Sequence, residues 1–179
     1  MRVLAIAGSL RTTSSNAALL RAGATVAPAG TEVVLYEGLA DLPLFSPDLD
    51  VDPLPAPVAA LRALIREVDA IVISSPEYAH GIPGALKNAL DWLVSATEPL
   101  GKPWLLISAS PTGAPHAHAH LLEVVRTMAT QVIDGGGHVF SRAKLDATGA
   151  VTSPDLLAAF ATGFRQLAAA AAALQAATA

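Results

Sequence analysis

The sequence predicts a three-layer α/β/α sandwich with a five-stranded parallel sheet of order 2-1-3-4-5. Short apolar runs, typical of buried strands, alternate along the 179 residues with segments of helical periodicity. Strands joined by helices form parallel sheets that helices cover on both faces. Right-handed crossovers leave few strand orders. The two loops richest in polar and turn residues follow the first and third strands, where this order places a ligand crevice.

The first half of the chain holds three predicted strands and two predicted helices. Arg2–Ala7 is a continuous apolar run of strand length. A serine N-cap precedes a helix over Ser15–Val26. Thr31–Tyr36 alternates polar and apolar residues and is the second strand. Val58–Glu67 has apolar residues at the spacing of one helix face, and Ala70–Ser74 is the apolar third strand.

The second half continues the alternation. Pro83–Val94 begins with a proline, which suits the first turn of a helix, and its leucines share a face. Pro103–Ser108 is the fourth strand. Pro115–Ile133 is predicted to be helical until three glycines end the helix. His138–Ser141 begins a short fifth strand, and a last helix starts at Pro154 after a serine cap. The whole pattern is flavodoxin-like, and we expect one domain over residues 1–179.

Composition excludes several kinds of protein. The hydrophobic content of 53% is ample for one core, and the formal charge of −4 does not indicate a nucleic-acid partner. The absence of cysteine excludes disulfides, thiolate metal sites and a cysteine nucleophile, and it is compatible with the reducing cytoplasm. We expect a cytoplasmic protein and no membrane partner, because no segment looks apolar enough to span a bilayer.

The segment 37–57 contains five prolines and no clear helix or strand. Loops of this length in compact domains are usually functional or disordered. Its apolar residues Leu42, Leu44 and Phe45 argue against disorder, so we expect it to fold over the ligand or onto a partner subunit. A surface excursion without a role is the alternative.

The loop after the first strand has the chemistry of a phosphate site. A helix begins there, and its free N–H groups and dipole favour an anion. Arg11 adds a guanidinium, Ser9 and Ser14 add hydroxyls, and Asn16 either holds the loop or donates from its amide. Neither the Walker pattern nor G-x-G-x-x-G is present. Simple capping of the helix by serine is the alternative interpretation.

The loop after the third strand suits a planar ring. Pro76, Glu77 and Tyr78 would expose backbone groups beside it, and Gly81 permits close approach of the backbone. A turn shaped only by proline and glycine is the alternative. Ser110 and Gly113, after the fourth strand, would line the other side. A phosphate at one strand end and a ring at another describe a mononucleotide site and favour FMN.

Two motifs support this interpretation. Residues 8–16 read G-S-L-R-T-T-S-S-N, and residues 76–92 read P-E-Y-A-H-G-I-P-G-A-L-K-N-A-L-D-W. Together they resemble the NADPH-dependent FMN reductase family, which includes FMN, quinone and chromate reductases, over Arg2 to about Phe140. The resemblance implies a flavodoxin-like fold, bound FMN, NADPH or NADH as co-substrate, and a homodimer or homotetramer.

The resemblance also implies roles for individual residues. The residues expected to hold the FMN phosphate are Ser9, Arg11, Ser14, Ser15 and Asn16. Pro76, Glu77 and Tyr78 are expected to contact the isoalloxazine. The chain departs from the family in two places: Ala79 stands where asparagine is common, and the third loop lacks the glycine pair often found there. Both departures border the ring and the nucleotide entrance.

We therefore expect an NAD(P)H-dependent oxidoreductase of the FMN reductase or quinone reductase type. In ping-pong fashion, NAD(P)H would pass hydride to FMN and leave before a quinone, a flavin or another small oxidant takes the electrons. No acid–base triad is expected; His80 is a candidate proton donor or a residue that only shapes the pocket. The alternatives are a flavodoxin-type electron carrier and a flavin-free module that binds another phosphate ligand.

Two groups of polar residues remain. Three histidines stand at positions 116, 118 and 120, and on a helix only His116 and His120 would share a face. Two histidines need further ligands to hold a metal. We predict no metal site and interpret these histidines as an entrance or subunit contact. Trp92 lies off the apolar face of its helix with three polar residues, Lys87, Asn88 and Asp91. An exposed tryptophan there would indicate a subunit contact.

Overall fold

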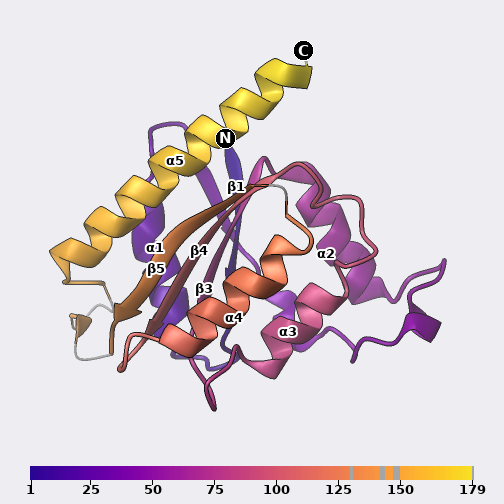
Figure 1. The fold of residues 1–179 in the computed structure, drawn as a ribbon, viewed down its shortest axis with the longest axis horizontal. Helices are drawn as coiled ribbons and strands as arrows, with labels where there is room; N and C mark the ends of the chain where they lie inside the picture. Colours follow the sequence, from indigo (N-terminus) through magenta and orange to yellow (C-terminus); the bar gives the residue numbers. More distant parts are fainter. Residues whose placement is uncertain (130, 142–143, 147–149, 179) are drawn as a thin grey trace.

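The computed structural model describes residues 1–129, 131–141, 144–146 and 150–178, and it confirms the α/β sandwich (Figure 1). A single parallel sheet has the predicted order β2-β1-β3-β4-β5. Its strands are β1 (Arg2–Ala7), β2 (Glu32–Leu35), β3 (Ala70–Ser75), β4 (Pro103–Ser110) and β5 (Gln131–Val139). The order reverses between β1 and β3, which leaves a crevice beyond their carboxyl ends.

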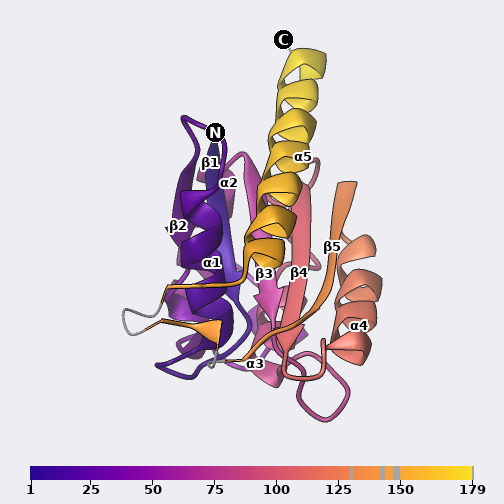
Figure 2. The same cartoon turned by 90° about the vertical axis from the view of Figure 1, so that its left-hand side faces the viewer.

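Helices cover both faces of the sheet (Figure 2). They are α1 (Ser15–Thr25), α2 (Ala56–Glu67), α3 (Gly84–Asp91), α4 (Pro115–Arg126) and α5 (Pro154–Thr178). Side chains alternate along each strand, so Leu4 and Ile6 pack against α2, α3 and α4, while Val3 and Ala5 pack against α1 and α5. Both faces are apolar, as expected for a parallel sheet between two helical layers.

The expected helix over Pro115–Ile133 is wrong in its second part. Helix α4 ends at Arg126, and β5 begins at Gln131 and runs through the three glycines. The fifth strand therefore begins well before His138, where the sequence placed its start.

Close approach to neighbouring backbone explains the glycines. A Cβ atom built on Gly135 would lie 2.4 Å from Cγ1 of Ile107, and one built on Gly137 would lie 2.3 Å from the carbonyl oxygen of Gly113. The pairing of β4 with β5 also shifts register in this stretch. The glycines thus allow an irregular strand to pass, rather than ending a helix.

The Pro-rich segment 37–57 packs on α2 and α3 through Leu39, Leu42 and Phe45. It does not line the cavities at the carboxyl edge of the sheet. Two short 3₁₀ turns, Gly38–Ala40 and Pro47–Leu49, lie within it. Trp92 is fully buried beneath the segment, donates its indole N–H to the carbonyl oxygen of Pro43 at 2.8 Å, and packs edge-on against Phe45. The expectation of an exposed Trp92 at a subunit contact is wrong, because this segment covers it.

We expected no segment apolar enough to span a bilayer, but α5 meets that criterion. By length and composition alone, Pro154–Ala177 could cross a membrane, with a mean hydropathy of 1.3. In the structure Phe160, Phe164 and Leu167 on this helix are fully buried against the sheet. The far end of the helix extends past the strands (Figure 1).

Candidate functional site

The loops after β1 and β3 are held together at the carboxyl edge of the sheet. The N–H of Gly8 donates to the carbonyl oxygen of Ser74 at 2.9 Å. Asn16 is only 3% exposed; its amide donates to the carbonyl oxygen of Ala109 at 3.1 Å and accepts from the Ser74 hydroxyl at 2.7 Å. Asn16 therefore holds the loop, which was one of its two predicted roles, and ties it to β3 and β4.

Most of the predicted site residues line one cavity of about 190 Å³ at this edge. They are Ser9, Arg11, Ser14, Ser15, Asn16, Pro76, Glu77, Tyr78 and Ser110. An adjoining cavity of about 400 Å³ shares Arg11 and Tyr78 and extends to Pro83 at the start of α3. Among the predicted residues, His80, Gly81 and Gly113 line neither cavity.

One end of the cavity suits a phosphate. The hydroxyl oxygen of Ser14 accepts the N–H of Ala17 at 3.2 Å and caps α1, so the positive end of the helix faces the loop. Arg11 is exposed, and its guanidinium has no hydrogen-bond or ion-pair partner in the described part of the chain. A phosphate dianion requires several hydrogen-bond donors and positive charge. The loop offers them through an unpaired guanidinium, hydroxyl groups and the free N–H groups at the start of α1.

The lining of the same cavity also includes the rings of Pro76, Tyr78, Pro111 and Phe140, which suit contact with a planar group. Sequence reasoning missed Phe140 and its neighbour Ser141. Both follow β5, whose carboxyl end lies at the same sheet edge, and a correct start for β5 would have indicated them.

Tyr78 and Gly81 close a two-residue hairpin at the cavity mouth. Each donates its N–H to the carbonyl oxygen of the other at 3.0 Å. The residues between them, Ala79 and His80, have φ of 48° and 59°. Positive φ at both central positions is the arrangement that favours Asn-Gly in such turns, so Ala79 is strained.

The side-chain carboxylate of Glu77 binds the start of α4. One carboxylate oxygen accepts the N–H groups of His116 at 2.8 Å and Ala117 at 2.9 Å, in the first turn of α4. A carboxylate is favoured there by the helix dipole. Glu77 therefore fastens the hairpin to α4, and we treat it as a positioning residue.

The loop after β4 is organised by its own hydrogen bonds. The hydroxyl oxygen of Ser110 accepts the N–H of Thr112 at 3.2 Å and that of Ala114 at 2.9 Å. Gly113 has φ of 89° and faces Gly137 rather than the cavity. A Cβ atom built on Gly113 would lie 3.5 Å from Val139, an ordinary contact, so the positive φ of this turn rather than lack of space favours glycine here.

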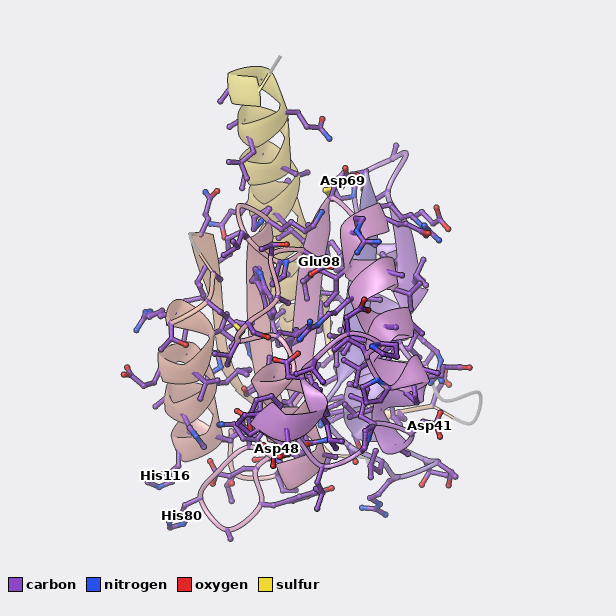
Figure 3. The ribbon with its side chains drawn as sticks, turned by 90° about the vertical axis from the view of Figure 1, so that its right-hand side faces the viewer. Asp41, Asp48, Asp69, His80, Glu98 and His116 are labelled. Carbon is purple, nitrogen blue, oxygen red and sulfur yellow. The ribbon has the colours of Figure 1, made fainter. Side chains whose placement is uncertain are left out.

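The histidines at positions 80, 116, 118 and 120 have different roles. His80 stacks on His116 with ring centroids 4.1 Å apart, and both are exposed (Figure 3). His120 lies close to Gly81. No group of three or more potential metal ligands occurs within the described residues.

His118 is buried and joins three elements. Its Nδ1 lies 3.0 Å from the hydroxyl oxygen of Ser108 on β4, and its Nε2 lies 2.8 Å from Asp134 on β5. This is the connectivity of a Ser-His-Asp triad, but Ser108 is fully buried and cannot act as a nucleophile. Burial alone would raise the pKa of Asp134; hydrogen bonds from His118 and the Gly136 N–H outweigh it and lower the pKa.

Comparison with known proteins decides the family. The sequence model of the NADPH-dependent FMN reductase family matches residues 1–144, which is most of the chain. The chain belongs to the NADPH-dependent FMN reductase family. It is 38% identical over 130 residues to a quinone reductase of Escherichia coli, covering 70% of this chain and 69% of that protein. It is 34% identical over 129 residues to an NAD(P)H-dependent FMN reductase of Pseudomonas aeruginosa, covering 70% and 69%.

A solved structure supports the same family assignment. The flavoenzyme FerB of Paracoccus denitrificans, an NAD(P)H:(acceptor) oxidoreductase, superposes with a TM-score of 0.77 at 28% identity, over 92% of this chain and 97% of that one. This reductase is thus an FMN-dependent NAD(P)H oxidoreductase, rather than a flavodoxin-type electron carrier or a flavin-free binding module. The family match includes every predicted site residue and ends before α5.

Proposed function

We propose that this reductase passes electrons from NAD(P)H through FMN to a quinone or another small oxidant, and that the two substrates use the same open face in turn. The observation that carries the proposal is the pair of adjoining cavities, which share Arg11 and Tyr78. One offers the donors for a phosphate, and the other leaves room beside Tyr78 for a second planar molecule. The names of the relatives, quinone reductase and FMN reductase, support the choice of acceptor.

The residues of this chain would hold FMN in two parts. Arg11, Ser9 and the first turn of α1 would bind the phosphate, with Asn16 fixing the loop. Tyr78 and Phe140 would flank the ring, with Glu77 holding the hairpin in place. Bound FMN supplies the capacity to accept hydride and to return electrons one or two at a time. We assign no proton-transfer role to His80, because it stacks on His116 and does not line the cavities.

Loss of the phosphate contact tests the site. Arg11→Gln removes a charge-assisted hydrogen bond worth about 1.5–3 kcal/mol, so FMN affinity should fall by about 10- to 100-fold. Arg165→Gln is the matched control, because Arg165 lies on α5 and bonds only to Thr162 among the described residues. Equal FMN affinity in the two variants would show that Arg11 does not contribute to FMN binding.

Initial rates test the function. Rates measured over a grid of NADPH and benzoquinone concentrations should give parallel lines in a double-reciprocal plot, as expected when one product leaves before the second substrate binds. The same grid with NADH and with free FMN as acceptor identifies the preferred pair. Intersecting lines would refute alternating use of one face, and an absence of turnover with every acceptor would refute the reductase proposal.

We also propose a homodimer or homotetramer, acting in the cytoplasm on small molecules without a nucleic-acid or membrane partner. Leu44 on the segment 37–57 is 82% exposed while its neighbours pack on α3, so that an apolar side chain faces outward. The lack of cysteine suits a reducing compartment. Light scattering at micromolar concentration tests the assembly, and a monomer there would contradict it.

A further inference from the structure

Strand β5 contains a β-bulge just before it reaches the cofactor cavity. Leu106 of β4 pairs with Asp134 of β5. Two residues further along β4, Ser108 pairs with Gly137, which is three residues further along β5, so β5 has one extra residue here. Gly136 within the bulge has φ of 82°, which glycine adopts without strain. Bulges are common beside active sites, where they redirect side chains.

The bulge changes the face of the sheet on which the following side chains lie. Before it, Ile133 packs in the core under α1 and α5, whereas Asp134 contacts His118 of α4 on the opposite face. Side chains alternate along a strand, so without the extra residue Phe140 would face α4, as Asp134 does. Phe140 instead packs in the same core as Ile133 and lines the cofactor cavity.

Two side chains hold the bulge by binding its backbone. In the register of strands β4 and β5, which are both described in full, Gly135 and Gly136 have no partner. One carboxylate oxygen of Asp134 accepts the N–H of Gly136 at 2.9 Å. The Nε2 of His138 donates to the carbonyl oxygen of Gly135 at 2.7 Å. These side chains therefore satisfy the backbone groups that the bulge removes from the ladder.

Helix α4 holds Asp134 and, through Glu77, the hairpin on which Tyr78 lies. The Nε2 of His118 lies 2.8 Å from the same Asp134 oxygen that binds the bulge. Glu77 binds the first turn of this helix, and its neighbour Tyr78 lines the cofactor cavity, as Phe140 does. The two segments that bring these aromatic rings to the cavity are thus fastened to one helix.

We propose that Asp134, held by His118, is a positioning residue for the flavin, because it fixes the bulge that directs Phe140 into the cofactor cavity. The inference rests on the proposed placement of FMN, with its ring beside Phe140. Neither Asp134 nor His118 is among the described residues that line the cavity. Their effect on the flavin is therefore carried by β5, and it concerns the ring rather than the phosphate.

Flavin binding to the apoprotein tests the proposal without turnover. Asp134→Ala should weaken FMN and riboflavin binding by the same factor, up to about tenfold, as expected for a lost aromatic contact. Riboflavin lacks the phosphate, so Arg11→Gln should weaken only FMN binding. Asp134→Asn keeps an acceptor for the Gly136 N–H and should bind both flavins nearly as wild type does. In a Phe140→Leu background, Asp134→Ala should have no further effect, because the ring through which it acts is absent.

A second variant perturbs the bulge through the backbone. Gly136→Ala places alanine at a positive φ, while the added Cβ would lie 3.6 Å from the nearest atom, an ordinary contact. Gly30→Ala is the matched control, because Gly30 has φ of 78° in the turn before β2 and an added Cβ meets nothing within 4 Å. Both variants should lose similar stability in urea, but only Gly136→Ala should weaken flavin binding.

Several results would overturn the proposal. They are wild-type flavin affinity in Asp134→Ala and Gly136→Ala, an equal loss when Asp134→Ala is made in the Phe140→Leu background, and equal weakening by Gly30→Ala and Gly136→Ala. Absence of flavin binding by the wild-type apoprotein would refute both this proposal and the proposed function. Flavin binding that responds as expected, in a protein that never oxidises NAD(P)H, would refute the proposed function alone.

Discussion

The phenol oxygen of Tyr78 lies 3.2 Å from the hydroxyl oxygen of Ser9. This contact joins the hairpin after β3 to the loop after β1, across the cavity that both loops line. Ser9 also accepts the N–H of Arg11 at 3.3 Å. The phosphate end and the ring end of the site are thus already linked, which reduces the ordering that ligand binding requires.

Removing this link should weaken FMN binding. Tyr78→Phe keeps the aromatic ring but loses one hydrogen bond worth about 1 kcal/mol, so we expect a roughly fivefold higher Kd for FMN. Ser9→Ala should reduce the free energy of FMN binding more, because it also removes a phosphate donor. The loss in the double variant should be smaller than the sum of the two single losses, because both single changes break the same bond. Fluorescence titration of FMN measures all three, and strict additivity would show that the contact does not contribute.

Glu77 should matter for stability as well as for binding. Glu77→Ala removes the acceptor from the first turn of α4 and releases the hairpin, so we expect a loss of about 1 kcal/mol in the free energy of unfolding and weaker FMN binding. Glu77→Gln keeps an uncharged acceptor, so its free energy of unfolding should lie between that of wild type and that of Glu77→Ala. Glu123→Ala, on an exposed face of the same helix, is the control. Urea unfolding that gives equal values for Glu77→Ala and Glu123→Ala would contradict this role.

Relief of backbone strain should stabilise the hairpin. Ala79 has φ of 48°, and asparagine tolerates this conformation better than alanine. We expect Ala79→Asn to raise the free energy of unfolding by about 1 kcal/mol. The same substitution at Ala119, exposed within α4, should instead lower it by about 0.5 kcal/mol through helix propensity. A loss of stability at both positions would show that Ala79 is not strained.

The hydrogen bonds of Asp134 with His118 and with the Gly136 N–H predict an acid-dependent loss of stability. The pKa of Asp134 is lowered in the folded protein, so its contribution is complete above the usual aspartate value of about 3.9 and disappears as pH falls through the folded pKa. Asp134→Asn should therefore show a shallower decline in the free energy of unfolding between about pH 4 and pH 2. Glu123→Gln should keep the wild-type slope. Identical slopes for wild type and Asp134→Asn would contradict the assignment.

Local patterns were sufficient to predict the sheet order and the two loops of the site. Strands β1 and β3 are nearly continuous apolar runs. The two site loops that follow them carry their polar residues in short contiguous motifs, so the strand order brings those loops together. The N-cap role of Ser14 and the loop-holding role of Asn16 were predicted for the same reason: their partners lie nearby in sequence or at the same sheet edge.

Features that depend on distant partners were not predictable. The glycines at 135–137 resemble a helix stop until Ile107 and Gly113 are placed beside them. Trp92 looks exposed on its own helix, and only the segment around Pro43 buries it. No role was predicted for the Glu77 side chain, because its partner, the first turn of α4, lies about forty residues away in the sequence. His118 was grouped with its exposed neighbours, although Ser108 and Asp134 bind it in the interior.

The most direct test is anaerobic mixing of the FMN-loaded protein with NADPH and, separately, with NADH. The account predicts that at least one nucleotide removes the visible absorbance of bound FMN, and that benzoquinone added afterwards restores it without further nucleotide. Unchanged absorbance with both nucleotides, in protein shown to retain FMN, would contradict it.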